Sequence, residues 1–304
     1  MTWNIRRCGM SAIDRKKKQK EIPERLSWRK ELRMLPCHIL LWLWIGFAIV
    51  CVLWILAASL STSGEIFRGE ALKFATGFHF ENYIKAWTQQ NISVYFMNSL
   101  IYASISSALL IVICAPAAYV LARYTFLGNK AMKSGLVMAM SIPSIMIILP
   151  ILNITTALKI NGTRGLLIFL YVAVSVPYTV TFLLDFFSHL SRTYEEAAAI
   201  DGCSPIKTFW KIMFPLAQPG IITVTIFNFL GIWNEYFMSL VFASVDAKRS
   251  VGVGLFTIVS AMKQNGDYGA MFAAVVIVFL PTFLLYLLLS QKVIAGVTGG
   301  GIKG

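Results

Sequence analysis

One carboxylate of this sequence lies well inside a long apolar stretch. Glu235 follows Trp233 and Asn234 and precedes Tyr236, and Asn228 lies seven residues before it. Seven residues make about two helical turns, so a continuous helix would place Asn228 and Glu235 on one face. An ionised carboxylate in hydrocarbon costs on the order of a few kcal/mol. Glu235 should therefore face a polar cavity or a partner.

Two interpretations of this polar group stay open. In the first, the five residues line a translocation path, because amides, a carboxylate and aromatic rings suit the hydroxyls and the faces of sugars. In the second, Glu235 makes an interhelical hydrogen bond or lies near the outer interface of a membrane. The second is slightly favoured, because carboxylates near an interface cost little.

No other group of side chains in the sequence indicates catalysis or a resident cofactor. The three histidines, His38, His79 and His189, lack metal spacing, and the five cysteines include no C-x-x-C pair. Neither a G-x-x-x-x-G-K-[ST] phosphate loop nor a G-x-S-x-G elbow is present. We therefore expect no enzyme activity, no metal and no cofactor on this chain. If ATP powers its work, the ATP and its Mg²⁺ belong to another polypeptide.

The segment 185–219 carries helix-capping signals. Glu195 and Glu196 suit the first turn of a helix, where the dipole favours negative charge, and Ala197–Ala199 continue it. Gly202 supplies a residue that can take a positive φ at the helix end. Ser204-Pro205 then caps and opens a second helix. The pattern predicts two short helices around a turn.

Three consecutive alanines on an exposed helix give a smooth surface with little side-chain entropy to lose. Such a surface fits closely into a groove on another protein, and flanking Glu, Asp and Lys would orient the contact. The alternative is a helical elbow on the membrane surface, since small residues also serve plain helix packing. Composition alone leaves docking and elbow equally open.

The elements around these residues are long apolar stretches. Hydrophobic residues make up 57% of the 304, and charged residues make up 13%, against about 25% in soluble domains. About 20 helical residues cross a hydrocarbon core. The sequence therefore predicts an all-α membrane protein with about six transmembrane helices. The predicted spans are His38–Leu60, Val94–Ala122, Gly135–Leu152, Gly165–Leu184, Gly220–Ala243 and Tyr268–Ser290.

The basic residues set the predicted orientation of these spans. With an inside N-terminus, the cytoplasmic segments are 1–37, 123–134, 185–219 and 291–304, and the outward loops are 61–93, 153–164 and 244–267. The cytoplasmic segments hold 19 of the 27 Lys and Arg, and the outward loops hold eight. The positive-inside rule therefore places both termini in the cytoplasm. We predict a basic cytoplasmic segment over 1–37 and a transmembrane domain over 38–304.

The segment 185–219 also carries a motif that resembles a known family. Glu196-Ala197-Ala198, Gly202, Ile212 and Phe214-Pro215 match the pattern E-A-A-x3-G-x9-I-x-L-P, with Phe214 where Leu is usual. This resembles the EAA loop of binding-protein-dependent ABC importer permeases of the carbohydrate type, similar to the second membrane subunit of maltose-type transporters. In that family, the loop is the coupling helix that fits a cleft on the cytosolic ATPase. The residues that the resemblance assigns to ATPase coupling are Glu196, Ala197, Ala198, Ala199, Asp201, Gly202 and Pro215.

Further segments agree with this resemblance and extend it over about residues 38–304. They are Glu81-Asn82-Tyr83 with Trp87, Asn98-Ser99-Leu100, Trp233-Asn234-Glu235-Tyr236 and the ending Gly296-x3-Gly300-Gly301-Ile302-Lys303-Gly304. The resemblance implies a permease subunit in a bacterial inner or plasma membrane, with helices of the type I importer kind. It implies that the chain forms half of a path for a carbohydrate, and we expect an oligosaccharide.

The resemblance also implies partners. These are a second, non-identical permease subunit, two ATPase subunits or domains that bind ATP and Mg²⁺, an extracytoplasmic solute-binding protein, and membrane lipid. One alternative is a permease for another solute, such as a glycerol phosphodiester or a polyol. The other is a self-sufficient secondary transporter or channel, which would transport without ATP. The lack of an evident inverted repeat and the scarcity of buried carboxylates weaken that second alternative.

Overall fold

The computed structural model describes residues 28–299, with side chains for residues 34–261 and 266–290. Residues 1–27 of the predicted basic segment, and 300–304 of the glycine-rich ending, lie outside this described part. The described residues form helices and the loops that join them, which confirms the predicted all-α class. By internal contacts, the chain divides into two units, residues 1–54 and residues 55–304.

Helix α2 (Trp28–Ser59) begins in the first unit and ends in the second. Its section Met34–Ser59 has the length and composition of a membrane span. Within the first unit, its described side chains are largely apolar on all sides and mostly exposed. A helix that is apolar all round suits a hydrocarbon surrounding rather than water.

Three further helices are long and apolar enough to cross a membrane without a break. They are α5 (Ile92–Arg123), α8 (Arg164–His189) and α15 (Tyr268–Gly299). Each contains its predicted span, and each continues through one internal proline. Prolines are tolerated within spans, because neighbouring helices and side chains satisfy the backbone groups that they free.

The third predicted span, Gly135–Leu152, is wrong as a single straight helix. α6 (Asn129–Met140) ends shortly before Pro143, and α7 (Ser144–Ala157) leaves at 97° to it. Proline disfavours helical backbone at the residue before it and cannot donate to the helix ladder. Pro143 itself is extended, with a ψ of 127°. The pair α6 and α7 is together long enough for one broken span.

The fifth predicted span, Gly220–Ala243, is also wrong as a single helix. α12 (Gln218–Trp233) ends well before Ala243, and the short helix α13 (Phe237–Phe242) follows a break. In the break, the carboxylate of Glu235 accepts a hydrogen bond from the backbone N–H of Met238 at 2.6 Å. Such a local side-chain bond offers the backbone an alternative to continued helix.

A second bend precedes α12 in the segment that carries the EAA motif. The chain passes through α9 (Thr193–Ile200), α10 (Pro205–Thr208), η2 (Phe209–Met213) and α11 (Phe214–Leu216). The helical run that ends in α11 meets α12 at 74°. If each bent pair is one span, the described residues hold six candidate spans, which is the number that the sequence predicts, although the fifth covers 205–233 rather than Gly220–Ala243.

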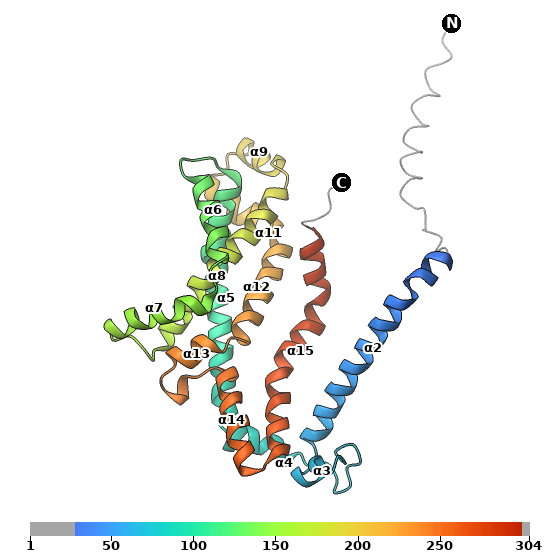
Figure 1. Cartoon of the computed structure of the whole chain (residues 1–304). Coiled ribbons are helices and arrows are strands. Elements are labelled where there is room, and N and C mark those ends of the chain that lie inside the picture. Colours follow the sequence, from blue (N-terminus) through green and yellow to red (C-terminus); the bar gives the residue numbers. More distant parts are fainter. Residues whose placement is uncertain (1–27, 300–304) are drawn as a thin grey trace. The chain divides into compact units, whose positions relative to one another are not determined.

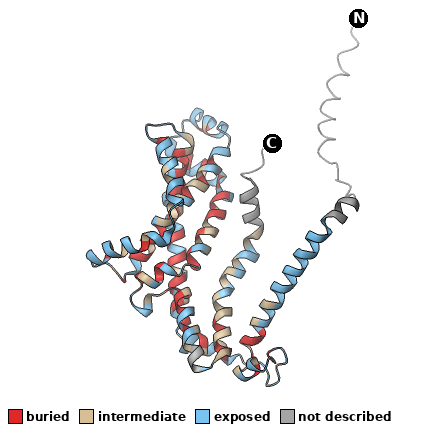
Figure 2. Ribbon diagram, viewed as in Figure 1, coloured by how far each residue is buried: buried red, intermediate tan, exposed pale blue. Residues whose placement is uncertain are grey.

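Helices α5, α8 and α12 form the centre of the second unit. α5 packs mainly against α8 and α12, α6 packs against α8, and α15 packs against α12. Buried side chains follow α5, α8 and α12 along their lengths (Figure 2). In this unit, α9 lies at one end, and the short helix α4 (Glu81–Ile84) and the helix α14 (Val251–Asn265) lie at the opposite end (Figure 1).

Helix α14 lies within residues 244–267, the third predicted outward loop. Val251, Val253 and Ile258 are buried, and the helix packs against α5 and α15. The other short elements at this end are α3 (Ser63–Phe67), η1 (Lys85–Gln89) and η3 (Asp246–Lys248). Asn98, near the start of α5, donates hydrogen bonds to the backbone carbonyls of Ala247 and Arg249 at 2.9 and 3.0 Å. These bonds hold η3 and the residue after it to α5.

Candidate functional site

The segment with the EAA motif forms the two short helices that the sequence predicts. Glu195 and Glu196 lie in the first turn of α9, and Gly202 follows its end with a φ of +72°. Ser204 caps α10 through its side chain, and Pro205 is the first residue of that helix. Glycine takes a positive φ at no steric cost, so Gly202 lets the chain turn sharply between α9 and α10.

The three alanines of α9 do not share one surface. Ala198 is 2% exposed and packs against its own chain, whereas Ala197 and Ala199 are exposed. Ile200, at the end of α9, is 87% exposed. The prediction that all three alanines form one exposed surface is therefore wrong, because Ala198 is buried. Glu196, Ala197, Ala199 and Ile200 are among the exposed residues of α9, and we call these four its outward side.

The exposed surface continues beyond α9. Asp201 and Gly202 in the turn and Pro215 in α11, which the resemblance also assigns to ATPase coupling, are exposed. Large apolar side chains lie on the same segment, since Ile206 is 74% exposed and Trp210 is 46% exposed. Exposed apolar side chains gathered beside charged ones are typical of an interaction surface.

Glu195 points inward, unlike its neighbour Glu196. Its Oε1 lies 3.1 Å from Nε of Arg123, the last residue of α5, and the side chains of Glu195 and Arg123 are 20% and 6% exposed. Nη2 of Arg123 also donates a hydrogen bond to the carbonyl of Leu190, directly after α8, at 2.7 Å. One guanidinium thus joins the ends of α5 and α8 to the first turn of α9.

Aromatic packing anchors the rest of this segment. Phe209 of η2 is 5% exposed, and its ring centroid lies 5.1 Å from that of Tyr119 and 6.2 Å from that of Phe187. Tyr119 belongs to α5 and Phe187 to α8. Each such aromatic pair contributes about 0.5–1.5 kcal/mol beyond its buried area. The motif segment is therefore fixed to the same two helices at two places.

A cavity of about 340 Å³ opens between α7, α8, α12 and α13. The residues of its lining that carry polar groups are Ser144, Tyr171, Ser175, Tyr178, Asn228 and Glu235, and the remaining wall is apolar. The polar groups are hydroxyls, an amide and a carboxylate, which together can donate and accept hydrogen bonds. A concave apolar site with a few polar groups is the usual form of a small-molecule site.

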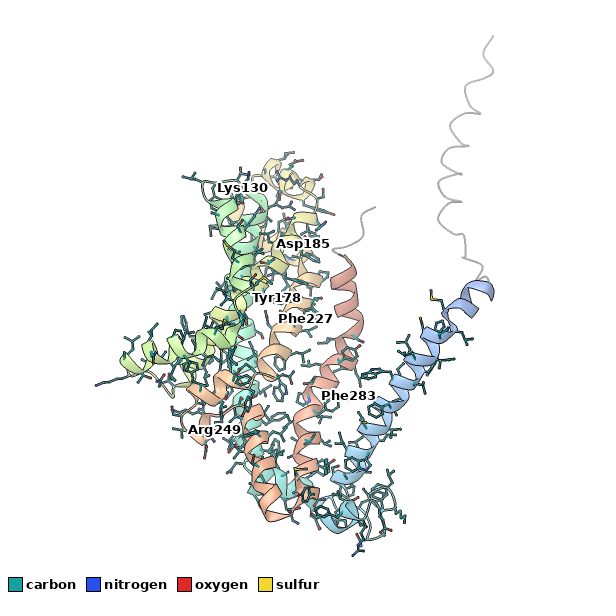
Figure 3. All side chains as sticks on the ribbon, in the orientation of Figure 1. Lys130, Tyr178, Asp185, Phe227, Arg249 and Phe283 are labelled. Atoms are coloured by element: carbon teal, nitrogen blue, oxygen red, sulfur yellow. The ribbon has the colours of Figure 1, made fainter. Side chains whose placement is uncertain are left out.

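The cavity lies near the middle of the second unit. Figure 3 shows Tyr178 and Phe227, which both line it, between Lys130 and Asp185 towards one end and Arg249 towards the other. Lys130 follows shortly after the end of α5, and Asp185 lies near the end of α8. The end of the unit that these two residues mark is the one where α9 lies. The cavity and the EAA surface are therefore separate sites joined by α8.

The structure supplies the interhelical hydrogen bond of the second interpretation of Glu235. The phenol of Tyr171 on α8 donates to its Oε2 at 2.9 Å. The backbone N–H groups of Met238 and Ser239 donate to its two oxygens at 2.6 and 3.2 Å. The carboxylate thereby caps α13 and joins it to α8, and it also contributes to the cavity wall.

Of the five residues that the first interpretation groups together, the structure brings only Asn228 and Glu235 into the cavity. Trp233 is 1% exposed and packs in a cluster with α5 and α15. Asn234 donates to the backbone of its own helix at 2.8 Å. Tyr236 packs against an aromatic ring of α14. None of these three side chains lines the cavity.

Sequence reasoning missed most of the polar cavity lining and the inner anchor of the EAA segment. Ser144, Tyr171, Ser175 and Tyr178 lie within apolar stretches without a spacing that marks them. Arg123 did leave a signal, because it is the first charge after a long apolar run. Across the described residues, no three His, Cys, Asp or Glu side chains gather in a way that could hold a metal ion.

The sequence is similar to those of several known proteins. A family model described as "binding-protein-dependent transport system inner membrane component" matches residues 110–294. The diacetylchitobiose uptake system permease protein NgcG of Streptomyces coelicolor is 35% identical over 88% of this chain and 88% of its own. The sulfoquinovosyl glycerol transport system permease protein SmoH of Agrobacterium fabrum is 32% identical over 90% of this chain and 94% of its own.

A solved structure supports the fold. It is a chain of a bacterial ABC transporter involved in the import of the acidic polysaccharide alginate. The two chains are 19% identical and superpose with a TM-score of 0.76, over 87% of this chain and 98% of the other. At this identity, the likeness concerns the arrangement of the helices.

Proposed function

We propose a function from one premise: this chain belongs to the family of binding-protein-dependent transport system inner membrane components. Members of this family are the permease subunits of ABC importers, so the chain is a multi-pass transport subunit and not an enzyme. Membership implies an ATPase, a second permease and a solute-binding protein as partners. On this premise, the chain forms one half of a translocation pathway for a neutral carbohydrate, which we take to be an oligosaccharide.

The ATPase docks on the outward side of α9 and the turn after it. The observation that carries this proposal is the division of α9 into two sides: Ala198 and Glu195 hold it to its own chain, while Ala197, Ala199 and Ile200 are exposed. Small exposed residues with one large apolar side chain suit insertion into a cleft.

This assignment also sets the orientation. The end of the second unit that carries α9 faces the cytoplasm, and the end with α4 and α14 faces outward (Figure 1). The distribution of Lys and Arg supports the same orientation, with both termini inside. ATP and Mg²⁺ then belong to the ATPase, which binds from the cytoplasmic side.

Co-purification tests the docking proposal. The tagged chain, expressed with the other subunits of its importer and purified in mild detergent, should carry the ATPase subunit. Ile200→Asp should weaken this association about thirtyfold, since a central apolar contact is worth about 2 kcal/mol. Leu127→Asp is the matched control, because Leu127 is an exposed apolar residue in the predicted cytoplasmic loop after α5. If both variants keep or both lose the ATPase, docking on α9 is refuted.

A carbohydrate substrate is supported by the cavity and by the relatives. The cavity presents hydroxyls of Ser144, Ser175 and Tyr178 and the amide of Asn228 beside the ring of Phe227. Hydroxyl and amide groups can exchange hydrogen bonds with sugar hydroxyls, and an aromatic ring can stack on a sugar face. NgcG is a diacetylchitobiose permease by its name, and diacetylchitobiose is a neutral disaccharide.

The second candidate function is a permease for an anionic glycerol derivative. It is supported by the similarity to SmoH, whose name refers to sulfoquinovosyl glycerol. The charge of the cavity favours the neutral solute. Its lining among the described residues includes Glu235 and neither Lys nor Arg, and a sulfonate or phosphodiester would gain from a cation there.

Uptake measurements separate the two candidates. Vesicles with the complete importer and its binding protein are tested with diacetylchitobiose, trehalose, sulfoquinovosyl glycerol and a glycerol phosphodiester. We expect ATP-dependent uptake of a neutral disaccharide, and about tenfold slower uptake after Tyr178→Ala, which removes an aromatic hydroxyl and the ring. Uptake of the anionic solutes alone would reject the neutral-solute proposal, and uptake without ATP would reject the importer mechanism.

A further inference from the structure

The two glutamates at the start of α9 have opposite surroundings, and docking accounts for only one of them. Glu196 belongs to the EAA motif and is exposed. Glu195 lies outside the motif, its side chain is 20% exposed, and its carboxylate faces Arg123. A carboxylate at this position is not needed to start the helix, because Glu196 is already in the first turn.

Arg123 is placed to hold three elements together. It is the last residue of α5, its Nη2 donates to the Leu190 carbonyl after α8 at 2.7 Å, and its Nε lies 3.1 Å from Glu195 Oε1 of α9. With only 6% of its side chain exposed, the guanidinium is largely out of water. We call Arg123, Leu190 and Glu195 the α5–α8–α9 junction.

The junction resists separate movement of α9. Charges that are shielded from water attract more strongly than exposed ones. Pulling Glu195 away from Arg123 would leave a largely buried cation without its partner, which is strongly unfavourable. A short helix held in this way moves together with the ends of the two long helices.

The long helices lead to the cavity. α8 begins at the outer end, carries Tyr171, Ser175 and Tyr178 in the cavity wall, and ends beside the junction. α5 packs along α8. A displacement of α9 that is passed to α8 is therefore passed to one wall of the cavity.

We infer that the Arg123–Glu195 pair is a transmission device, in which Glu195 acts as a positioning residue that couples movement of α9 to α5 and α8. The inference rests on the proposed docking of the ATPase to the outward side of α9. The two sides of α9 then have different roles. The outward side binds the ATPase, and Glu195 on the inner side couples the resulting movement of α9 to the cavity wall.

The test uses the complete importer in vesicles, with the native cysteines of this chain replaced and Ser175→Cys as a reporter in the cavity. The labelling rate of this cysteine by a membrane-impermeant maleimide is measured with and without ATP and Mg²⁺. Co-purification of the ATPase is measured on the same samples. The variants are Glu195→Gln, Arg123→Gln and the double variant, and Asp185→Asn is the control, since Asp185 is an exposed acid at the same end of α8.

We expect ATP to change the labelling rate in the native protein and in Asp185→Asn. Glu195→Gln and Arg123→Gln should each keep the ATPase bound but reduce the ATP-dependent change at least about fivefold, the lower bound of typical coupling. The double variant should be no worse than Arg123→Gln alone, because Arg123→Gln already removes the ion pair with Glu195 as well as the hydrogen bond to Leu190. If Glu195→Gln does not fold, Glu195→Asp replaces it, since it keeps the charge but shortens the side chain.

Three results would overturn the inference. An unchanged ATP response with the ATPase still bound would show that the pair transmits nothing. Loss of the ATPase from Glu195→Gln would place Glu195 in docking. Independent, multiplying effects of the two single variants would show that Arg123 and Glu195 do not act as a pair. If the native chain binds no ATPase at all, the docking proposal fails instead, so the two failures are distinguishable.

Discussion

The phenol of Tyr171 donates a hydrogen bond to Oε2 of Glu235 at 2.9 Å, across the gap between α8 and the break that follows α12. Tyr171 is 3% exposed, so this bond lies within the packed helices. Because the same carboxylate caps α13, the bond joins α8 to the second half of a broken span. The one acidic side chain inside an apolar stretch thus supports the cavity wall.

Replacement of Tyr171 by Phe should destabilise the protein without changing its cavity shape much. A hydrogen bond to a charged group contributes about 1.5–3 kcal/mol, and its loss leaves the Glu235 carboxylate with fewer donors. Thermal unfolding of the purified chain in detergent measures the effect. Tyr178→Phe is the control, because the Tyr178 hydroxyl makes no hydrogen bond within the described residues. Equal midpoints for the two variants would show that the Tyr171–Glu235 bond contributes no stability.

Glutamate substitutions at two adjacent alanines of α9 should have opposite effects. Ala198→Glu forces a charge into a position that is 2% exposed, so we expect a loss of about 3 kcal/mol or more in the free energy of unfolding. Ala199→Glu places the charge on the exposed side. It should leave the unfolding midpoint unchanged and weaken ATPase association. Thermal unfolding and co-purification on both variants check this, and the reverse pattern would contradict the division of α9 into two sides.

The segment that contains α3 should lose stability in acid because of Glu65. Backbone N–H groups of Thr62 and Thr76 donate to its carboxylate, and these bonds with both hydroxyls lower the pKa of Glu65 from 4.5 to about 2. A carboxyl whose pKa is lower in the folded state stabilises that state above pH 4.5. This contribution is lost as the pH falls through about 2.

Hydrogen exchange of residues 62–76 against pH measures the effect. The native segment should be better protected than Glu65→Gln at pH 6, and the difference should shrink as the pH falls from about 4.5 to about 2. Glu81→Gln, which alters a carboxylate that is 63% exposed, should be protected like the native chain at pH 6. A constant difference between native and Glu65→Gln across this range would mean that the charge of Glu65 is not responsible.

Gly202 should resist replacement by residues with a side chain. Its φ of +72° is unfavourable for alanine by about 1–2 kcal/mol, although no atom lies within 4 Å of an added Cβ. Gly202→Ala should therefore lower the unfolding midpoint, and Gly202→Asn should lower it less. Gly135→Ala, inside α6 with open space around it, should raise stability by about 0.5–1 kcal/mol through helix propensity. Stabilisation by Gly202→Ala would show that the turn relaxes to another conformation.

Much of the fold could be predicted from the chain alone, because its strongest signals are local. The long apolar stretches place α2, α5, α8 and α15, since a stretch without charges that is long enough to cross a bilayer favours a helix wherever its neighbours lie. The capping residues of the EAA segment predict α9, its turn and α10 correctly. The turn depends on Gly202 and the adjacent residues, so the sequence is sufficient for it.

The breaks were harder to predict. Pro143 was visible in the sequence, but prolines such as Pro116 lie inside continuous helices. The break after α12 depends on the carboxylate of Glu235, which finds its donors on α13 and on Tyr171 of α8. A partner that is distant in sequence leaves no periodic signal near Glu235.

Sequence by itself determined the class of protein, the number of apolar stretches and the local shape of the EAA segment. Only the tertiary structure decided which side of α9 is free, which residues share the cavity, and that Glu195 pairs with Arg123. The physical reason is the range of the interactions. Helix formation, capping and membrane insertion depend on neighbouring residues and on the solvent, whereas burial, cavity lining and ion pairing depend on which helices pack together.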